Sequence, residues 1–343
     1  MQRIIRSRSP LRISFAGGGT DVPPYPELYG GAVISTTIDR YAYVTLKPNP
    51  KKGIRIISQD FNLFEEFKKI SDMKIDGKTN LIKAAVAQAG LGNENLDIVV
   101  HVDSPPGSGL GSSSALSAAL IGCLSRYLNE HLTSYEIAER AVELERKWLN
   151  IKGGYQDQYA STFGGFNLIE FGKSVIVNPL RLRPEVLQEL LASMILVDTG
   201  KTRLSGNILE HQINKYEKKD PKTLDHLDVI KKLVYTIKDD LLKGNIPEVG
   251  HALDIHWNHK KEIDKKISNL RIERIYQKAK KIGIFGGKLL GAGGGGHMLF
   301  VCEPDRKHEV IKAIEKMNIE VIRFNFDNDG LRTWVVEDHK VVY

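Results

Sequence analysis

Glycine, serine and proline are concentrated in residues 103–115, which read Asp-Ser-Pro-Pro-Gly-Ser-Gly-Leu-Gly-Ser-Ser-Ser-Ala. The prolines restrict the backbone, whereas the glycines permit positive φ angles and a close approach of a ligand. We expect residues 112–114 to cap a helix that begins near Ala115, whose free N–H groups and positive dipole end would bind an anion. A nucleoside triphosphate is the anion we expect. Its predicted binding residues are Pro106, Gly107, Ser108, Gly109, Leu110, Gly111, Ser112, Ser113 and Ser114.

Two further glycine-rich segments lie far from this one in the sequence. Residues 9–21 read Ser-Pro-Leu-Arg-Ile-Ser-Phe-Ala-Gly-Gly-Gly-Thr-Asp, and residues 291–298 read Gly-Ala-Gly-Gly-Gly-Gly-His-Met directly before an apolar strand. One such segment is equally consistent with an ordinary turn before a helix, but three of them favour convergence on one site. None of the three segments has the Gly-Lys-Ser/Thr ending of a P-loop, and none places the Rossmann glycine spacing at the start of a helix. Both of those classes are therefore disfavoured.

A carboxylate lies on the apolar side of a predicted helix. Thr133 and Glu136 form a capping box that starts this helix, and Glu145 falls on its apolar stripe. The stripe consists of Ala138, Ala141, Val142 and Leu149. A carboxylate on an apolar face is costly unless it is paired or bound to a metal. Glu145 is therefore either an ion-paired residue at the helix end or a metal ligand.

The ordered set of glycine-rich segments resembles the GHMP kinases, the family of galactokinase, homoserine kinase, mevalonate kinase and phosphomevalonate kinase. The family motifs are Pro-x-Arg/Lys on the substrate side, Pro-x-x-x-Gly-Leu-Gly-Ser-Ser around the phosphates, and a glycine-rich loop near the C-terminus. In this chain they correspond to residues 10–12, 105–113 and 291–296. The resemblance covers almost the whole chain, and residues 12–21 are most similar to the sugar 1-kinase branch, which includes heptose 7-phosphate kinases. It implies ATP and Mg²⁺ as the cofactors.

The resemblance also implies roles for single side chains. Asp157 matches the Asp of the family segment Gly-x-x-Asp-Gln and would deprotonate or orient the attacking hydroxyl. Arg12 matches the cation that approaches this Asp and would help to activate the hydroxyl. Glu145 would bind Mg²⁺ together with a hydroxyl of the Gly/Ser segment, from Ser113 or from Ser114.

On the substrate side, Asp21 aligns with an Asp that binds ring hydroxyls in galactokinase. Gly18 and Gly19 stand where galactokinase has Glu and His, which disfavours galactose and leaves room for a bulkier sugar. Lys201 and Arg203 form either a phosphate cradle or an ordinary polar turn. The predicted substrate-binding residues are Gly18, Gly19, Thr20, Asp21, Lys201, Arg203, Gly293 and Gly294.

The elements that position these residues alternate between strands and helices, which indicates an α+β protein. Strands are expected at 12–16, 32–37, 42–47, 96–102, 194–199, 297–302 and 319–326, and helices at 81–89, 115–128, 133–149 and across 206–283. We expect two domains, residues 1–190 and residues 191–343. The resemblance implies an ATP-binding N-terminal domain like the second domain of ribosomal protein S5 and a ferredoxin-like C-terminal domain, with the active site between them.

The composition excludes several classes of protein. The 49 Lys and Arg residues against 42 Asp and Glu give a net charge of +7, but the basic clusters alternate with acidic residues, as on solvated helix faces. No motif of a nucleic-acid-binding fold accompanies them. Cys123 and Cys302 are too isolated for a disulfide framework or a zinc site. No segment reaches the roughly 20 apolar residues that span a bilayer. We expect a cytoplasmic protein that binds neither nucleic acid nor membrane, and nothing in the sequence indicates its oligomeric state.

Together these features predict a kinase that phosphorylates the anomeric hydroxyl of a sugar, with D-glycero-D-manno-heptose 7-phosphate as the substrate that the resemblance implies. A fucokinase-like kinase of an unphosphorylated sugar is the alternative within the class. A sugar and ATP sensor without catalysis on the same fold is the alternative outside it. The presence of Arg12, Glu145 and Asp157 favours an enzyme.

Overall fold

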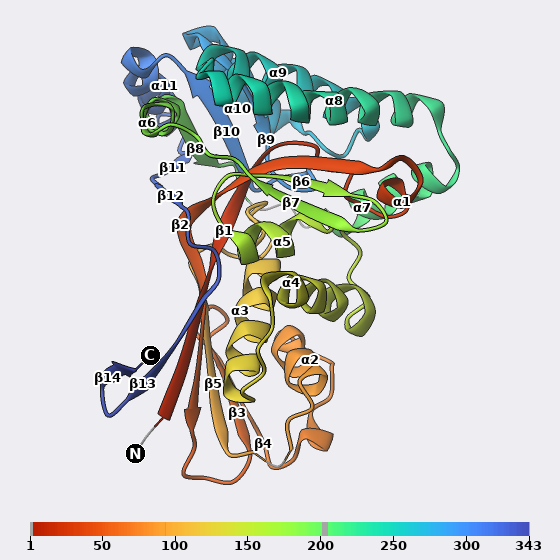
Figure 1. The fold of residues 1–343 in the computed structure, drawn as a ribbon. Helices are drawn as coiled ribbons and strands as arrows, with labels where there is room; N and C mark the ends of the chain where they lie inside the picture. The colour runs from red at the N-terminus through yellow and green to blue at the C-terminus, as the bar shows by residue number, and fades with distance from the viewer. Residues whose placement is uncertain (1–2, 93, 201–204, 343) are drawn as a thin grey trace.

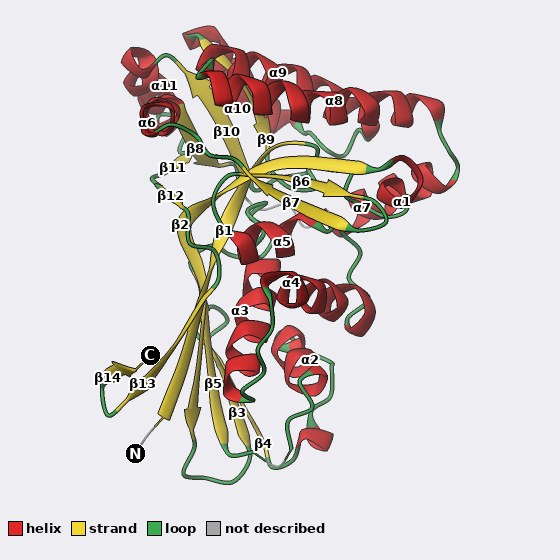
Figure 2. Ribbon diagram, in the orientation of Figure 1, coloured by secondary structure: helices red, strands yellow, loops and turns green. Residues whose placement is uncertain are grey.

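The computed structural model describes residues 3–92, 94–200 and 205–342. The chain forms two β-sheets with helices packed against them, and the α+β prediction is confirmed (Figures 1 and 2). Among these residues, no helix combines the length and the apolar character needed to cross a membrane.

The larger sheet is built around two long strands, β1 (Arg3–Ala16) and β2 (Gly31–Pro48), which pair antiparallel. In the described part of the chain its main order is β14 (Lys340–Val342), β13 (Arg332–Glu337), β1, β2, β5 (Leu96–Val102), β3 (Ile54–Ser58) and β4 (Leu63–Phe67). Strands β6 (Asn167–Phe171) and β12 (Phe326–Asp327) also pair with β2, and β7 (Val175–Pro179) pairs with β6. The strand predicted at 96–102 is confirmed, whereas the strands predicted at 32–37 and 42–47 are parts of the single strand β2.

Helices α2 (Asn80–Gln88), α3 (Ser112–Tyr127), α4 (Ser134–Glu143) and α5 (Gln156–Phe163) lie together on one side of this sheet (Figure 2). The small residues of α3 let it pack closely on β1 and β2. The Thr133 capping box is confirmed, and α4 continues into a π-helical turn, Leu144–Trp148. The predicted serine cap of α3 is wrong, because Gly111 is the N-cap residue in a left-handed conformation and residues 112–114 already form the first helical turn.

The smaller sheet has the order β11 (Glu320–Ile322), β8 (Met194–Asp198), β10 (His297–Cys302) and β9 (Ile284–Leu289), with antiparallel neighbours. In the described part of the connection, four helices lead from β8 to β9: α7 (Ser205–Glu217), α8 (Pro221–Lys243), α9 (Ile246–Ile263) and α10 (Leu270–Ile282). Helix α11 (Pro304–Glu315) connects β10 to β11, so the sequence of elements is the β-α-β-β-α-β pattern of a ferredoxin-like unit. Two shorter helices, α1 (Tyr25–Tyr29) and α6 (Pro184–Ser193), precede β2 and β8.

One hydrophobic core joins the two sheets, since it contains Leu11 and Ile13 of β1 as well as Leu196 of β8 and Leu299 of β10. The last strands of the chain, residues 326–342, return to the larger sheet and pair with β1 and β2. The boundary expected between residues 190 and 191 stays a prediction. We would refine it by assigning the returning strands to the first domain.

Candidate active site

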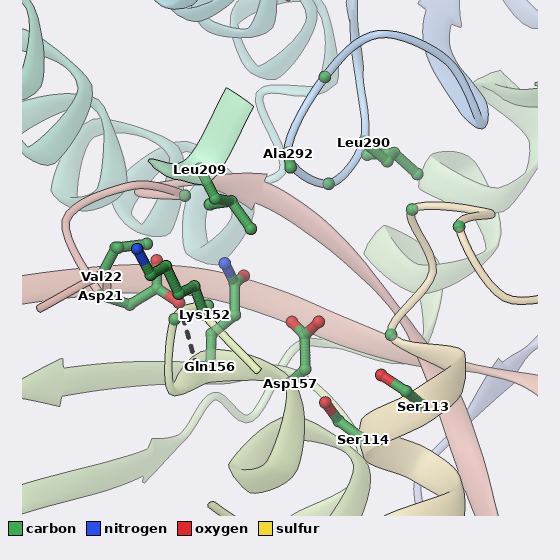
Figure 3. A pocket seen from close by; sticks show the side chains of 18 of the residues that line it. Asp21, Val22, Ser113, Ser114, Lys152, Gln156, Asp157, Leu209, Leu290 and Ala292 are labelled. Atoms are coloured by element: carbon green, nitrogen blue, oxygen red, sulfur yellow. Dashed lines mark hydrogen bonds between the residues drawn. The ribbon is translucent and has the colours of Figure 1, made fainter. Parts of the chain in front are cut away.

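A pocket of about 240 Å³ is lined by residues of all three glycine-rich segments (Figure 3). Gly18 and Gly19 follow β1, residues 106–109 and 111–114 lead into α3, and Gly291, Gly293 and Gly295 lie in the loop between β9 and β10. The predicted convergence of the segments is therefore present in the structure.

The glycines let two of these loops lie directly against each other. Gly109 has φ +78°, and a Cβ atom there would lie 2.5 Å from the carbonyl oxygen of Leu290. A Cβ on Gly296 would lie 2.6 Å from the carbonyl oxygen of Ser108. That same oxygen accepts hydrogen bonds from the backbone N–H and the Nδ1 of His297, at 2.8 and 2.7 Å. Bulkier residues would separate the loops that form this wall of the pocket.

The N-terminus of α3 faces the pocket without a side-chain cap. Its first N–H groups and its dipole are therefore available to an anion, and the phosphate site stays a prediction. Ser108 and Ser112 contact each other through their hydroxyl oxygens at 2.9 Å, whereas Ser113 is exposed. Leu110 is different from the other residues of the segment, since its side chain belongs to the hydrophobic core.

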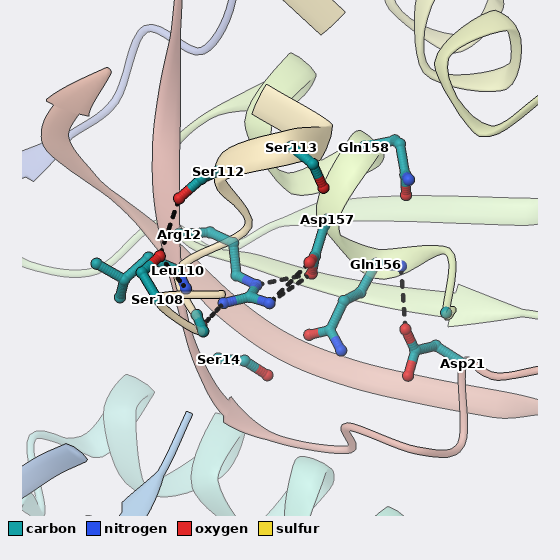
Figure 4. A network of polar contacts seen from close by, with 12 residues as sticks. Arg12, Ser14, Asp21, Ser108, Leu110, Ser112, Ser113, Gln156, Asp157 and Gln158 are labelled. Carbon is teal, nitrogen blue, oxygen red and sulfur yellow. Dashed lines mark hydrogen bonds and ion pairs between the residues drawn. The ribbon is translucent and has the colours of Figure 1, made fainter. Parts of the chain in front are cut away.

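Arg12 and Asp157 form a bidentate ion pair at the base of the pocket (Figure 4). Nε and Nη2 of Arg12 donate to the two carboxylate oxygens at 2.7 and 2.8 Å. Nη1 of Arg12 donates to the carbonyl oxygen of Gly109, which ties the pair to the phosphate-binding segment. The Arg12 side chain is 3% exposed and that of Asp157 is 25% exposed. The carboxylate is therefore held by a buried cation on one side and remains accessible to a ligand on the other.

Gly111, the N-cap residue of α3, lies beside this pair. A Cβ atom at Gly111 would lie 3.4 Å from Arg12 Cγ and 3.4 Å from the carboxyl carbon of Asp157, and the backbone φ is +76°. Arg12 joins this pair to the segment that leads into α3, because its Nη1 donates to the Gly109 carbonyl and its backbone N–H donates to the Leu110 carbonyl at 2.9 Å.

Glu145 lies in the π-helical turn after α4 and is 2% exposed. Its Oε1 accepts hydrogen bonds from Ser117 and from the Gln158 amide, at 3.0 and 2.9 Å. Contacts to Oε2 in the described part of the chain are longer, 3.5 Å from both Ser113 Oγ and Arg146 Nη1. The sequence left two hypotheses for Glu145, an ion pair and a metal ligand. The structure shows a long ion pair with Arg146 and also places Oε2 beside the Ser113 hydroxyl of the pocket.

This donor set fits Mg²⁺. In the described residues no group of three or more His, Cys, Asp or Glu side chains could hold a metal. Mg²⁺ usually takes one or two protein oxygens, with phosphates and water completing its shell. Oε2 of Glu145 and the exposed hydroxyl of Ser113 supply these two oxygens beside the anion site. Ser114 is 3% exposed, which makes Ser113 the better candidate.

Asp21 lies on the opposite side of the pocket from the α3 N-terminus (Figure 3). It is 1% exposed and accepts hydrogen bonds from the backbone N–H groups of Gly19 and Gln156, at 3.0 and 3.1 Å. Burial raises the pKa of Asp21, and the nearby Asp157 acts in the same direction. Lys260 of α9 lines the same part of the pocket and donates to the Gly18 carbonyl at 3.0 Å. Its burial lowers its pKa to about 8.

Family models match two parts of the chain: GHMP kinases N terminal domain at residues 80–165 and GHMP kinases C terminal at residues 237–320. The D-glycero-alpha-D-manno-heptose 7-phosphate kinase of Campylobacter jejuni is 38% identical over 97% of this chain and 99% of its own length. The chain belongs to the GHMP kinase family. Its predicted GHMP kinase fold is thereby confirmed.

Solved structures of GHMP kinases agree with this assignment. A D-glycero-D-manno-heptose 1-phosphate kinase from Bacteroides thetaiotaomicron superimposes with a TM-score of 0.82 at 34% identity and covers 96% of this chain and 98% of its own. The galactokinase of Lactococcus lactis, solved with galactose, has a TM-score of 0.73 at 18% identity over 96% and 94% of the two chains. This second likeness concerns the fold alone.

Two predicted substrate residues of this GHMP kinase, Thr20 and Gly294, do not line the pocket. Thr20 is fully buried, and its hydroxyl is occupied by the carbonyl oxygens of Gly17 and Ala32 at 2.8 and 2.9 Å, so it stabilises the turn. Gly293 lines the pocket, whereas Gly294 is not among the lining residues, and its backbone bonds with Ile267. The predicted phosphate-binding residues Lys201 and Arg203 lie outside the described residues.

Other pocket residues of the GHMP kinase were missed at the sequence level. Lys152, Gln156, Gln212 and Lys260 all contribute to the lining. Gln156 precedes Asp157 in a quoted motif, but Gln212 and Lys260 lie on long polar helices where no motif distinguishes them from solvated residues. Only the fold brings these helices over the Gly18 and Gly19 turn.

A second, largely apolar pocket of about 510 Å³ adjoins the phosphate-binding segment. Pro106, Ser112 and Ser113 line both pockets, so the two are neighbours. The remaining lining of the second pocket includes apolar side chains such as Leu116 and Trp148. Its size and apolar character suit a flat ring system attached to the phosphates.

Proposed function

We propose that this chain is an ATP-dependent sugar 1-kinase that transfers the γ-phosphoryl group to the anomeric hydroxyl of D-glycero-D-manno-heptose 7-phosphate and forms the 1,7-bisphosphate. The observation that supports a kinase best is the Arg12–Asp157 pair, which a hydrogen bond from Arg12 to the Gly109 carbonyl joins to the segment that leads into α3. The heptose is inferred from relatives that match over nearly the whole chain. Such an activity would serve the formation of nucleotide-activated heptose for surface polysaccharide in the cytoplasm.

In this proposal the phosphates of ATP lie at the N-terminus of α3, and the base occupies the apolar pocket beside Leu116 and Trp148. The sugar lies between Asp21 and Asp157, with its anomeric hydroxyl at the accessible side of the Asp157 carboxylate. Asp157 orients this hydroxyl and accepts its proton as the bond to phosphorus forms, and the ADP oxygen leaves on the far side. Arg12 balances the charge of Asp157 and holds the carboxylate in place.

Ser113 and Glu145 would hold Mg²⁺ next to the phosphates. When bound, the ion neutralises negative charge on the transferring group. Ser117 and Gln158 keep the carboxylate of Glu145 oriented toward Ser113 through their hydrogen bonds to its other oxygen. These two hydrogen bonds offset part of the cost of burying the Glu145 carboxylate.

The test is ADP release with ATP and Mg²⁺ against heptose 7-phosphate, the unphosphorylated heptose, mannose, fucose and galactose. We expect turnover of heptose 7-phosphate and its loss in Asp157→Asn. If only an unphosphorylated sugar is turned over, the proposal of a sugar kinase stands and the proposal of heptose 7-phosphate as its substrate is wrong. Turnover of fucose would support the fucokinase-like alternative. This alternative is included because the L-fucokinase/L-fucose-1-P guanylyltransferase of Bacteroides fragilis is 28% identical over 94% of this chain and 37% of its own length. Binding of sugar and ATP without ADP release would support the alternative of a sugar and ATP sensor without catalysis.

A further inference from the structure

Gln212 of α7 has a buried amide group that finds no partner among the described residues. The side chain is 0% exposed, and in the described part of the chain neither its Oε1 nor its Nε2 forms a hydrogen bond. It nevertheless lines the pocket that contains Asp21 and Asp157. Burying an amide without hydrogen bonds is unfavourable, so such a group in a native pocket requires an explanation.

The position of α7 places this amide on the sugar side of the pocket. Leu209, Gln212 and Tyr216 are spaced three and four residues apart, so they share one face of the helix. The Tyr216 hydroxyl donates to the carbonyl oxygen of Gly19 at 3.3 Å. Leu209 extends toward Gln156 in Figure 3. The face that carries Gln212 therefore covers the Gly18 and Gly19 turn, away from the N-terminus of α3.

Gln156 shows the same pattern from the other side. Its Oε1 is buried and has no partner among the described residues, and its Nε2 would lie 3.5 Å from a Cβ atom on Gly18. Two amides from α5 and α7 thus have free hydrogen-bonding capacity in one pocket. A hydroxyl group both donates and accepts, so neighbouring hydroxyls on a sugar ring can satisfy an amide oxygen and an amide nitrogen together.

We infer that Gln212 binds hydroxyl groups of the sugar substrate and contributes to the selection of the sugar. The inference rests on the proposed function in that the ligand is the phosphoryl acceptor. It adds a specificity residue from the C-terminal part of the chain to a site whose motif residues come from other segments. Gln212 takes no part in proton transfer, so its loss acts on binding of the acceptor.

The experiment compares the wild type with Gln212→Leu, which keeps the size of the side chain and removes both polar atoms. We expect the KM for the sugar to rise about tenfold or more, the factor expected for loss of one or two hydrogen bonds between uncharged groups. The KM for ATP should stay within twofold. The thermal unfolding temperature without ligand should be equal or higher, because an unsatisfied amide has been removed.

Asn214→Leu is the matched control, since it removes an amide from an exposed position of the same helix. It should leave both KM values unchanged. Monodeoxy analogues of the sugar identify the contact: at least one should be a weaker substrate of the wild type and suffer no further loss in Gln212→Leu. If Gln212→Leu folds poorly, Gln212→Met provides the same comparison with an unbranched side chain.

An unchanged KM for the sugar would overturn the inference. The inference would also be overturned if the KM for ATP rose in parallel, or if a lowered unfolding temperature accounted for the weaker sugar binding. It would be overturned as well if the loss caused by Gln212→Leu added to the loss caused by every deoxy analogue. The proposed function is judged separately, by which sugars the wild type phosphorylates. The role of Gln212 is judged by the ratio of the KM of the variant to the KM of the wild type, measured on any sugar of the panel that is turned over. A wild type that phosphorylates none of the sugars would refute both the proposed function and the role of Gln212.

Discussion

Replacing Asp157 by Asn separates its charge from its shape. Arg12 donates two hydrogen bonds to the carboxylate, and Arg12 itself is 3% exposed. An amide oxygen at this position can accept one of these bonds, so the variant loses one charge-assisted bond and the charge balance of the pair. We expect the free energy of unfolding to fall by about 1–3 kcal/mol, which corresponds to a lowering of the unfolding temperature by a few degrees.

The effect on the reaction should be much larger than this structural cost. Loss of a general base typically lowers kcat by about 10² to 10⁴, or about 3–5 kcal/mol in the activation barrier. Asp97→Asn is the matched control, because Arg55 contacts Asp97 in the same bidentate manner at 2.5 and 2.6 Å and Asp97 is 3% exposed. It should lower stability by a similar amount and leave kcat unchanged. ADP release and urea unfolding of both variants provide the comparison.

Two results would refute the reasoning. If Asp157→Asn keeps kcat within threefold of the wild type, Asp157 neither accepts the proton nor orients the hydroxyl. If Asp97→Asn lowers kcat as much as Asp157→Asn does, the loss reflects general destabilisation of the larger sheet.

Three further changes test other parts of the site. Glu145→Gln should raise the Mg²⁺ concentration for half-maximal activity at least tenfold in a titration of initial rates, because the ion loses a charged oxygen; an unchanged titration would remove Glu145 as a ligand. Gly109→Ala should weaken ATP binding in calorimetry at least tenfold, since its Cβ would lie 2.5 Å from the Leu290 carbonyl in a backbone with φ +78°; full affinity would show that the loops need not touch. Lys260 has a pKa lowered to about 8 from 10.5, so its charged form destabilises the folded state at neutral pH, and this penalty disappears as the pH rises from about 8 to 10.5. The wild type should therefore gain stability relative to Lys260→Met over that range in urea unfolding, and equal pH slopes would contradict the assignment.

Much of the site was predictable from sequence because short motifs encode local backbone geometry. The anion site needs glycines before a helix, and both features are contiguous in residues 107–115. Glu145 was predictable in a different way, since a carboxylate in an apolar stripe implies burial, and it is 2% exposed. The serine cap failed because Gly111 already adopts the left-handed conformation that starts the helix, so the first turn takes in the serines.

The remaining parts depend on contacts between distant segments. The return of residues 326–342 to the larger sheet is a pairing with β1 and β2, which local propensity does not encode. Thr20 looked like a ligand because it neighbours Asp21, yet its hydroxyl is used by the turn. Lys260 becomes significant only when α9 is placed over Gly18.

The sequence motifs identify the enzyme family more clearly than they identify the sugar acceptor, and the positions of the pocket residues explain the difference. In this chain Arg12, Asp157 and Glu145 lie around the start of α3, joined to it through Gly109 and Ser113. The side of the pocket proposed for the acceptor is instead lined by residues of α7 and α9, which belong to the insertion between β8 and β9. Such an insertion can change its polar residues without disturbing the transfer machinery. Specificity in this chain should therefore be sought on α7 and α9, where Gln212 is the first position to test.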